Sequence, residues 1–128
     1  MKKLLVAIIG IFLLAGCSKN NQYTQDLTST WYIYKLTYYS VQVPFSNDSI
    51  GNNYTVTFSS NGQYVEQNIN GVDTVYTPGT WQFQNSYGTL AMTSDSSKVQ
   101  TTYTVFNLTG NSVELLNNGY DRYMRKIK

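Results

Sequence analysis

The sequence predicts an all-β domain, an antiparallel up-and-down meander of about eight strands that closes into a small barrel. From residue 29 onward Tyr, Thr and Val dominate, which is typical of strands. No segment there carries a helical apolar stripe of useful length. Short alternating segments recur between Asn-Gly-type turns, and a meander of this kind loses its free edges most simply by closing on itself.

The turn signals divide this region into eight or nine expected strands. Tyr54–Phe58 and Thr80–Gln84 show the clearest apolar–polar alternation, which is the pattern of a half-buried strand. Pro78-Gly79 is expected to separate two strands, because these residues punctuate regular structure. The expected strands cover residues 31–39, 54–58, 63–69, 73–77, 80–84, 89–93, 101–108, 112–116 and 120–127.

The first sixteen residues are expected to form a secretory signal peptide. Lys2 and Lys3 make a short basic start, an apolar segment follows over residues 4–15, and small residues precede Cys17. A transmembrane helix is the alternative interpretation. Twelve apolar residues fall short of the roughly 20 that a span needs, and polar residues follow from Ser18 onward.

Leu14-Ala15-Gly16-Cys17 resembles the lipobox of bacterial lipoproteins. The resemblance implies cleavage before Cys17 and acylation of that cysteine, with chains such as palmitate, so the membrane is an expected partner. No Asp stands beside the cysteine, and in the enterobacterial lipoproteins that it resembles such a start leads to the outer membrane of a Gram-negative envelope. We therefore expect an outer-membrane anchor facing the periplasm, a polar stalk over residues 17–28 and a barrel over residues 29–128.

Charge and composition exclude several function classes. Without Lys2 and Lys3 the chain is formally neutral, so it carries no basic surface for nucleic acid. Cys17 is the single cysteine, so the folded domain has no disulfide, and there is no His for a triad or a transition metal. No cofactor and no metal site are expected.

Two acidic residues in strands are the remaining candidates for catalysis. Glu66 and Glu114 could form a glycosidase-like pair if both faced one cavity. Strand periodicity instead favours an outward position for each carboxylate. We therefore expect a protein that is not an enzyme.

Four segments carry a resemblance to a known family: residues 27–31, which open the first expected strand, and residues 54–64, 79–81 and 88–90. Together they resemble small lipocalin-like lipoproteins, which are lipid-anchored barrels of Gram-negative envelopes. In lipocalins the first strand carries Gly-x-Trp, and an Arg near the end of the barrel packs across that Trp. Ser29 stands at the Gly position here and Trp31 at the Trp position. The resemblance thus implies a structural contact of Trp31 with Arg122 or Arg125, of the cation–π kind.

The aromatic content gives the functional hypothesis. Twelve Tyr and two Trp are present, and a cup of such rings suits a small apolar or amphipathic ligand bound without catalysis. The alternative is a barrel filled by its own side chains, acting as an envelope interaction module or inhibitor that docks a protein partner. The candidate ligand-binding residues, taken from the inward positions of the expected strands, are Trp31, Ile33, Tyr54, Val56, Phe58, Trp81, Phe83 and Tyr103.

Overall fold

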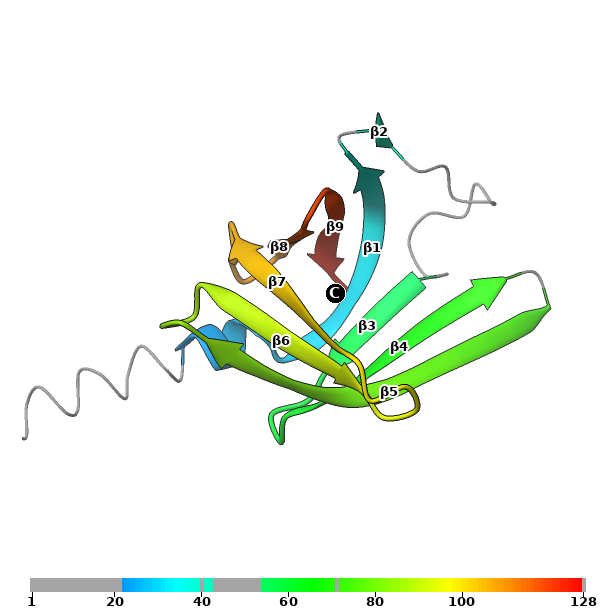
Figure 1. Cartoon of the computed structure of the whole chain (residues 1–128), viewed down its shortest axis with the longest axis horizontal. Helices are drawn as coiled ribbons and strands as arrows, with labels where there is room; N and C mark the ends of the chain where they lie inside the picture. Colours follow the sequence, from blue (N-terminus) through cyan, green and yellow to red (C-terminus); the bar gives the residue numbers. More distant parts are fainter. Residues whose placement is uncertain (1–21, 40, 43–53, 71, 128) are drawn as a thin grey trace, which may run out of the picture.

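The described part of the chain is a closed antiparallel barrel. The computed structural model describes residues 22–39, 41–42, 54–70 and 72–127. Within them, each strand from β3 to β8 pairs with the next, and β1 pairs with both β3 and β9, so eight strands close on themselves (Figure 1). This confirms the predicted all-β fold. The strands are β1 (Ser29–Tyr38), β2 (Val41–Gln42), β3 (Tyr54–Phe58), β4 (Gln63–Asn70), β5 (Asp73–Gln84), β6 (Thr89–Ser94), β7 (Gln100–Phe106), β8 (Ser112–Asn117) and β9 (Tyr120–Lys126).

The antiparallel order gives the barrel two distinct ends. We call the end with the helix of residues 22–27 and the turns 59–62, 85–88 and 107–111 the closed end. The opposite end, with the turns 95–99 and 118–119, is called the mouth. Since β1 begins at the closed end, the chain enters the barrel there.

Residues 22–27 correct the expected start of the domain. The prediction placed them in a polar stalk, but they form a short helix, and Leu27 is fully buried in the core. The indole N–H of Trp31 donates to the carbonyl oxygen of Leu27 at 2.8 Å, which fixes the helix across the closed end. A single apolar residue in a polar segment has no periodicity to reveal it. The predicted signal peptide and Cys17 lie outside the described residues, within which no helix is long and apolar enough to cross a membrane.

β5 is one strand, so the expected break at Pro78-Gly79 is wrong. Pro78 pairs with Val65 of β4, and its carbonyl oxygen accepts from the N–H of Asp95 on the other side, where β6 has ended. Pro78 has no N–H to donate on this side, and because the β6 ladder ends at Ser94, no ladder hydrogen bond is lost there. A Cβ on Gly79 would lie 2.2 Å from the carbonyl oxygen of Thr93, so β5 and β6 approach closely there.

A bulge in β1 sets which residues of its second half face inward. The pairing with β9 shifts between Ile33 and Lys35, which leaves Tyr34 as the extra residue. Ile33 is buried before the shift and Leu36 after it. Leu36 pairs with Arg122, so the bulge brings the interior of β1 level with this arginine of β9.

Candidate functional site

The predicted inward residues do face the interior, and most of them fill it. Six of the eight candidates are buried, and Tyr54 and Phe83 pack against the same core. The indole N–H of Trp81 donates to the carbonyl oxygens of Ser59 and Gln63, at 3.1 and 2.9 Å, so backbone groups at the closed end satisfy it. The six buried candidates are Trp31, Ile33, Val56, Phe58, Trp81 and Tyr103.

The predicted contact between Trp31 and Arg122 is wrong. The β1–β9 register places Trp31 opposite Lys126, and the ammonium of Lys126 lies 5.2 Å from the centre of the indole ring. Arg122 pairs with Leu36 nearer the mouth, and Arg125 lies over the ring of Tyr34 at 4.4 Å. The cation on Trp31 is therefore a lysine, because the register of two strands far apart in sequence decides which residue meets the ring.

Arg122 is instead the centre of a polar cluster inside the mouth. It is 8% exposed, and its Nη1 donates to Oε1 of Glu66 at 2.6 Å. The hydroxyl of Tyr54 donates to the other carboxylate oxygen of Glu66 at 3.0 Å. The guanidinium also lies 5.3 Å from the ring centre of Tyr103 and 5.9 Å from that of Tyr54, within cation–π range. Four side chains from β3, β4, β7 and β9 thus hold one buried ion pair.

Glu66 corrects the prediction that both strand glutamates face outward. It alternates with buried Tyr64 on β4, and its side chain is 16% exposed. Glu114 does lie outside, because Val113 and Leu115 on either side of it are the buried residues of β8. The two carboxylates are therefore on opposite sides of the barrel wall and do not form a glycosidase-like pair.

The mouth keeps its hydroxyls protonated and its guanidinium charged. Burial raises the pKa of Tyr54 and of Tyr103 above the ordinary tyrosine value, and burial raises the pKa of Tyr64 to about 12. Burial on its own would lower the pKa of Arg122, but Tyr54 and Glu66 raise it by more, so the net shift is upward. Within the described part of the chain, Nε of Arg122 is buried without a hydrogen-bond partner. The mouth therefore holds O–H donors and a cation at neutral pH.

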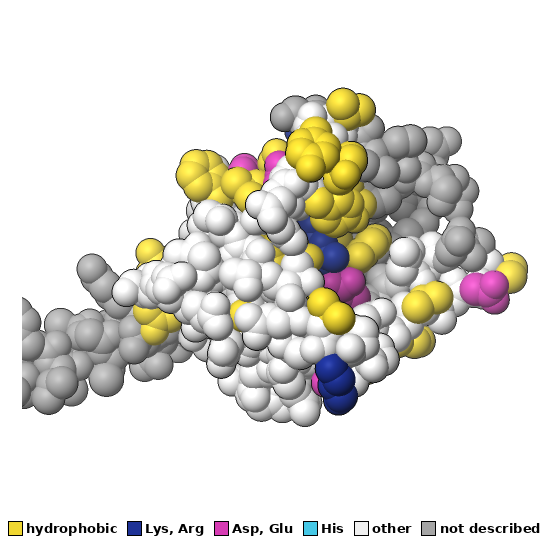
Figure 2. All heavy atoms as spheres, in the orientation of Figure 1, with side chains coloured by type: hydrophobic (Ala, Val, Ile, Leu, Met, Phe, Trp, Pro, Cys, Tyr) yellow, Lys and Arg dark blue, Asp and Glu magenta, His cyan; other side chains and the backbone are white. Residues whose placement is uncertain are grey.

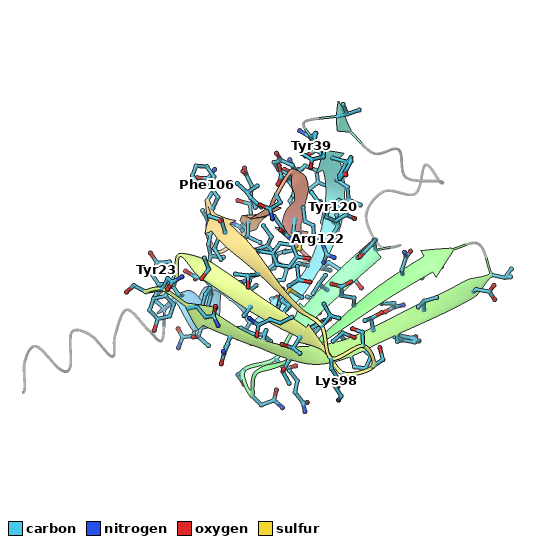
Figure 3. The ribbon with its side chains drawn as sticks, in the orientation of Figure 1. Tyr23, Tyr39, Lys98, Phe106, Tyr120 and Arg122 are labelled. Atoms are coloured by element: carbon cyan, nitrogen blue, oxygen red, sulfur yellow. The ribbon has the colours of Figure 1, made fainter. Side chains whose placement is uncertain are left out.

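A cavity of about 160 Å³ opens beside the ion pair. Figure 2 shows a dark-blue and a magenta side chain together in a hollow at the centre of the molecule, where Figure 3 labels Arg122. The volume corresponds to about five water molecules, at about 30 Å³ each, which is less than the 300–1,000 Å³ of sites for drug-sized ligands. Its lining residues are Tyr64, Glu66, Met92, Ser94, Ser97, Val99, Thr101, Tyr103 and Arg122.

Two further hollows lie at the closed end. They measure about 410 and 370 Å³, and both are open to solvent beside Tyr87. Tyr23, Phe83 and Tyr87 form the aromatic walls of these depressions. Among the residues that the structure describes, no three His, Cys, Asp or Glu side chains come together as a metal site.

The polar cluster was not predicted, although the sequence carries a signal for it. Arg122 stands two residues before Met124, which is fully buried, and Glu66 stands two residues after the buried Tyr64. Each charged residue thus shares the inward parity of an apolar neighbour on its own strand. The prediction took Glu66 as the outward, polar member of the alternation, whereas counting by twos from the inward Tyr64 places it inside the barrel.

Comparisons with known proteins agree with the fold. No protein-family model matches the sequence, and no curated protein sequence matches it. A crystal structure of a lipocalin-like protein from Bacteroides uniformis superposes with a TM-score of 0.64 at 14% identity, covering 80% of this chain and 99% of that one. An uncharacterized protein from Bacteroides eggerthii also gives a TM-score of 0.64, at 12% identity, over 79% of this chain and 99% of that chain. At these identities the likeness shows a shared lipocalin-like barrel fold.

Proposed function

We propose that this protein is a lipid-anchored envelope lipoprotein whose barrel binds a small amphipathic ligand at its mouth without catalysing a reaction. The observation that carries the proposal is the buried Arg122–Glu66 pair in the wall of the 160 Å³ cavity. Burying an ion pair rarely stabilises a fold more than apolar packing of the same volume would. A buried pair beside a cavity is better explained by a ligand that uses its donors and acceptors.

The chemistry of the cavity describes the ligand. The guanidinium of Arg122 donates hydrogen bonds, the carboxylate of Glu66 accepts them, and the hydroxyls of Tyr64 and Tyr103 do both. A ligand group with donors and acceptors, such as a hydroxyl or an amide, suits this set. Met92 contributes apolar surface beside it. The volume limits the bound part to a small molecule or to the polar end of a longer one.

Native mass spectrometry of the exported protein tests ligand binding. We expect a small-molecule adduct on the wild-type chain that is lost under denaturing conditions. Tyr103→Phe should weaken or remove the adduct, because it deletes one hydroxyl from the cavity wall and keeps the ring. Glu114→Gln is the matched control, since Glu114 lies outside the barrel. A bare mass for every variant would contradict a retained ligand.

The membrane anchor is tested separately at Cys17. Cys17→Ala should leave the fold intact and release the protein from the membrane fraction, because acyl chains on this cysteine are the proposed anchor. Fractionation of the envelope and protease accessibility would report the expected outer-membrane, periplasm-facing position. Retention of the alanine variant in the membrane would contradict a lipid anchor at this residue.

Exposed apolar residues on one hairpin favour docking of an envelope protein as the second candidate. The β4–β5 hairpin extends away from the rest of the barrel (Figure 1). Val72, Val75 and Tyr76 are 100%, 57% and 62% exposed on it. If this hairpin docks a protein partner, Val75→Thr with Tyr76→Ser should abolish co-purification of that partner and leave any small-molecule adduct unchanged.

A further inference from the structure

The closed end carries a cluster of partly exposed aromatic side chains at the edge of the core. The ring of Tyr23 stacks on that of Tyr87, with centres 5.1 Å apart and planes 10° apart. Both rings contact Phe83 edge-on, at 6.4 and 5.1 Å. Phe106, at the end of β7, is 52% exposed, and Figure 3 labels it on the same side of the molecule as Tyr23, which is 39% exposed. We call Tyr23, Phe83, Tyr87 and Phe106 the aromatic end.

The backbone at the aromatic end is held in an unfavourable conformation. Asn85, Ser86 and Tyr87 all have positive φ, at 51°, 54° and 72°. Residues other than glycine rarely adopt this region, and three in succession are unusual. This turn holds Tyr87 against Tyr23, where part of its ring remains at the surface. Strain of this kind concentrates at functional positions.

The turns around the aromatic end contain no charged residue. Residues 82–88 and 105–112 consist of apolar, amide, hydroxyl and glycine residues. The last strand reaches this end with Arg125 and Lys126, and the N–H of Lys126 donates to Asn111 of the 107–111 turn. Two carboxylates lie nearby, Asp26 in the helix and Glu114 on β8, and each accepts a hydrogen bond from a neighbouring amide. Apart from these, the end consists of aromatic rings and neutral polar groups with basic residues at the rim, which matches the interface of a phospholipid bilayer, where Tyr and Trp are enriched.

Chain length also places this end near the membrane. This step rests on the proposed function, in which Cys17 carries the acyl chains. Four residues separate Cys17 from Gln22, the first described residue, and the five Cα–Cα steps between these two residues span about 18 Å at most when fully extended. The helix of residues 22–27 begins at the closed end, so the tether delivers this end, and not the mouth, to the bilayer surface.

We propose that the aromatic end rests on the surface of a phospholipid bilayer, with the rings of Tyr23 and Phe106 at the depth of the headgroups. The barrel then stands on its closed end with the mouth directed away from the membrane. The tether restricts the distance from the bilayer, and the aromatic contact restricts the orientation.

Site-specific fluorescence on the acylated full-length chain tests this orientation. Since Cys17 is the only cysteine and is acylated, a new cysteine can be labelled selectively. Asn111→Cys places an environment-sensitive fluorophore at the closed end, and Val72→Cys, at a fully exposed residue of the β4–β5 turn, is the control at the other end. The measurement uses vesicles of phosphatidylcholine and phosphatidylglycerol. At position 111 we expect a blue shift of the emission and quenching by lipids brominated near the headgroup. At position 72 we expect no blue shift and no quenching.

Two further measurements separate the possible failures. Tyr23→Ser with Phe106→Ser, in the Asn111→Cys background, should remove most of the blue shift while the intact mass still shows acylation. Equal signals at positions 111 and 72 on an acylated chain would overturn this inference and leave the lipoprotein proposal standing. An intact mass without acyl chains would overturn both.

Discussion

Removing Glu66 should destabilise the barrel far more than removing an acidic residue from its outer wall. Arg122 is always charged, and in the described structure Glu66 is its ion-pair partner. In Glu66→Leu this charge stays in a site where the arginine side chain is only 10% exposed, and the hydroxyl of Tyr54 loses its acceptor. Breaking a buried pair by removing one partner costs about 3–5 kcal/mol, and we expect about 3 kcal/mol because both side chains retain some exposure.

A double-mutant cycle gives the interaction energy. The cycle compares Glu66→Leu, Arg122→Met and the double variant. The double variant removes both charges and replaces them with apolar side chains, so it should recover about 2 of the roughly 3 kcal/mol lost in Glu66→Leu, and the coupling energy equals this recovery plus the cost of Arg122→Met alone. Urea unfolding followed by the fluorescence of Trp31 and Trp81, which are both buried, measures each free energy of unfolding.

Glu114→Leu is the control for this cycle. Glu114 lies on the outer wall, so its replacement should change the free energy of unfolding by no more than about 0.5 kcal/mol. If Glu66→Leu costs no more than Glu114→Leu, or if the double variant shows no recovery, the reasoning about a buried and uncompensated charge is refuted.

Three further predictions concern the core and the mouth. Trp31→Ala should cost about 3–5 kcal/mol of unfolding free energy, measured in urea, because the side chain is fully buried and holds the helix at the closed end. Gly79→Ala should cost about 1–3 kcal/mol of unfolding free energy, because the added methyl group would collide with the backbone oxygen of Thr93. Gly110→Ala is the control and should be nearly neutral, since no atom lies within 4 Å of the added methyl group. Thermal unfolding compares the two variants. Burial raises the pKa of Tyr64 from 10.0 to about 12, so between these values the folded state binds more protons than the unfolded state. The contribution of Tyr64 to stability should therefore be constant from neutral pH to about pH 10 and fall as the pH rises towards 12. Unfolding midpoints at stepped pH would check this, with Tyr64→Phe showing a smaller loss.

Local pattern was sufficient to predict most of the strands and the inward positions of their apolar residues. Tyr54–Phe58 has the predicted bounds, because the two signals that define this strand, its alternation and the Asn61-Gly62 turn after it, are local in the sequence. The burial of Trp31, Val56 and Trp81 also follows from a period of two along each strand.

Contacts between distant strands could not be predicted in the same way. Which cation meets Trp31 depends on the register of β1 against β9, and a bulge at Tyr34 shifts that register. Glu66 lies on β4 and Arg122 on β9, 56 residues apart in sequence, so no local pattern indicates that they pair. The burial of Leu27 depends on the barrel end that the helix covers, which exists only in the folded chain.

Closure through β1 and β9 has a consequence for how the chain folds. The first and last strands of the barrel lie next to each other, so the ladder from Trp31–Lys126 to Tyr38–Tyr120 forms only after nearly the whole domain has been synthesised. Contacts between such distant residues slow folding, which for β-rich domains takes milliseconds to seconds. Until then β1 and β8 each expose an unpaired edge that other chains can pair with. For the exported lipoprotein proposed above, this order would help translocation, because the N-terminal half has no closed structure to adopt while the C-terminal strand is still to follow.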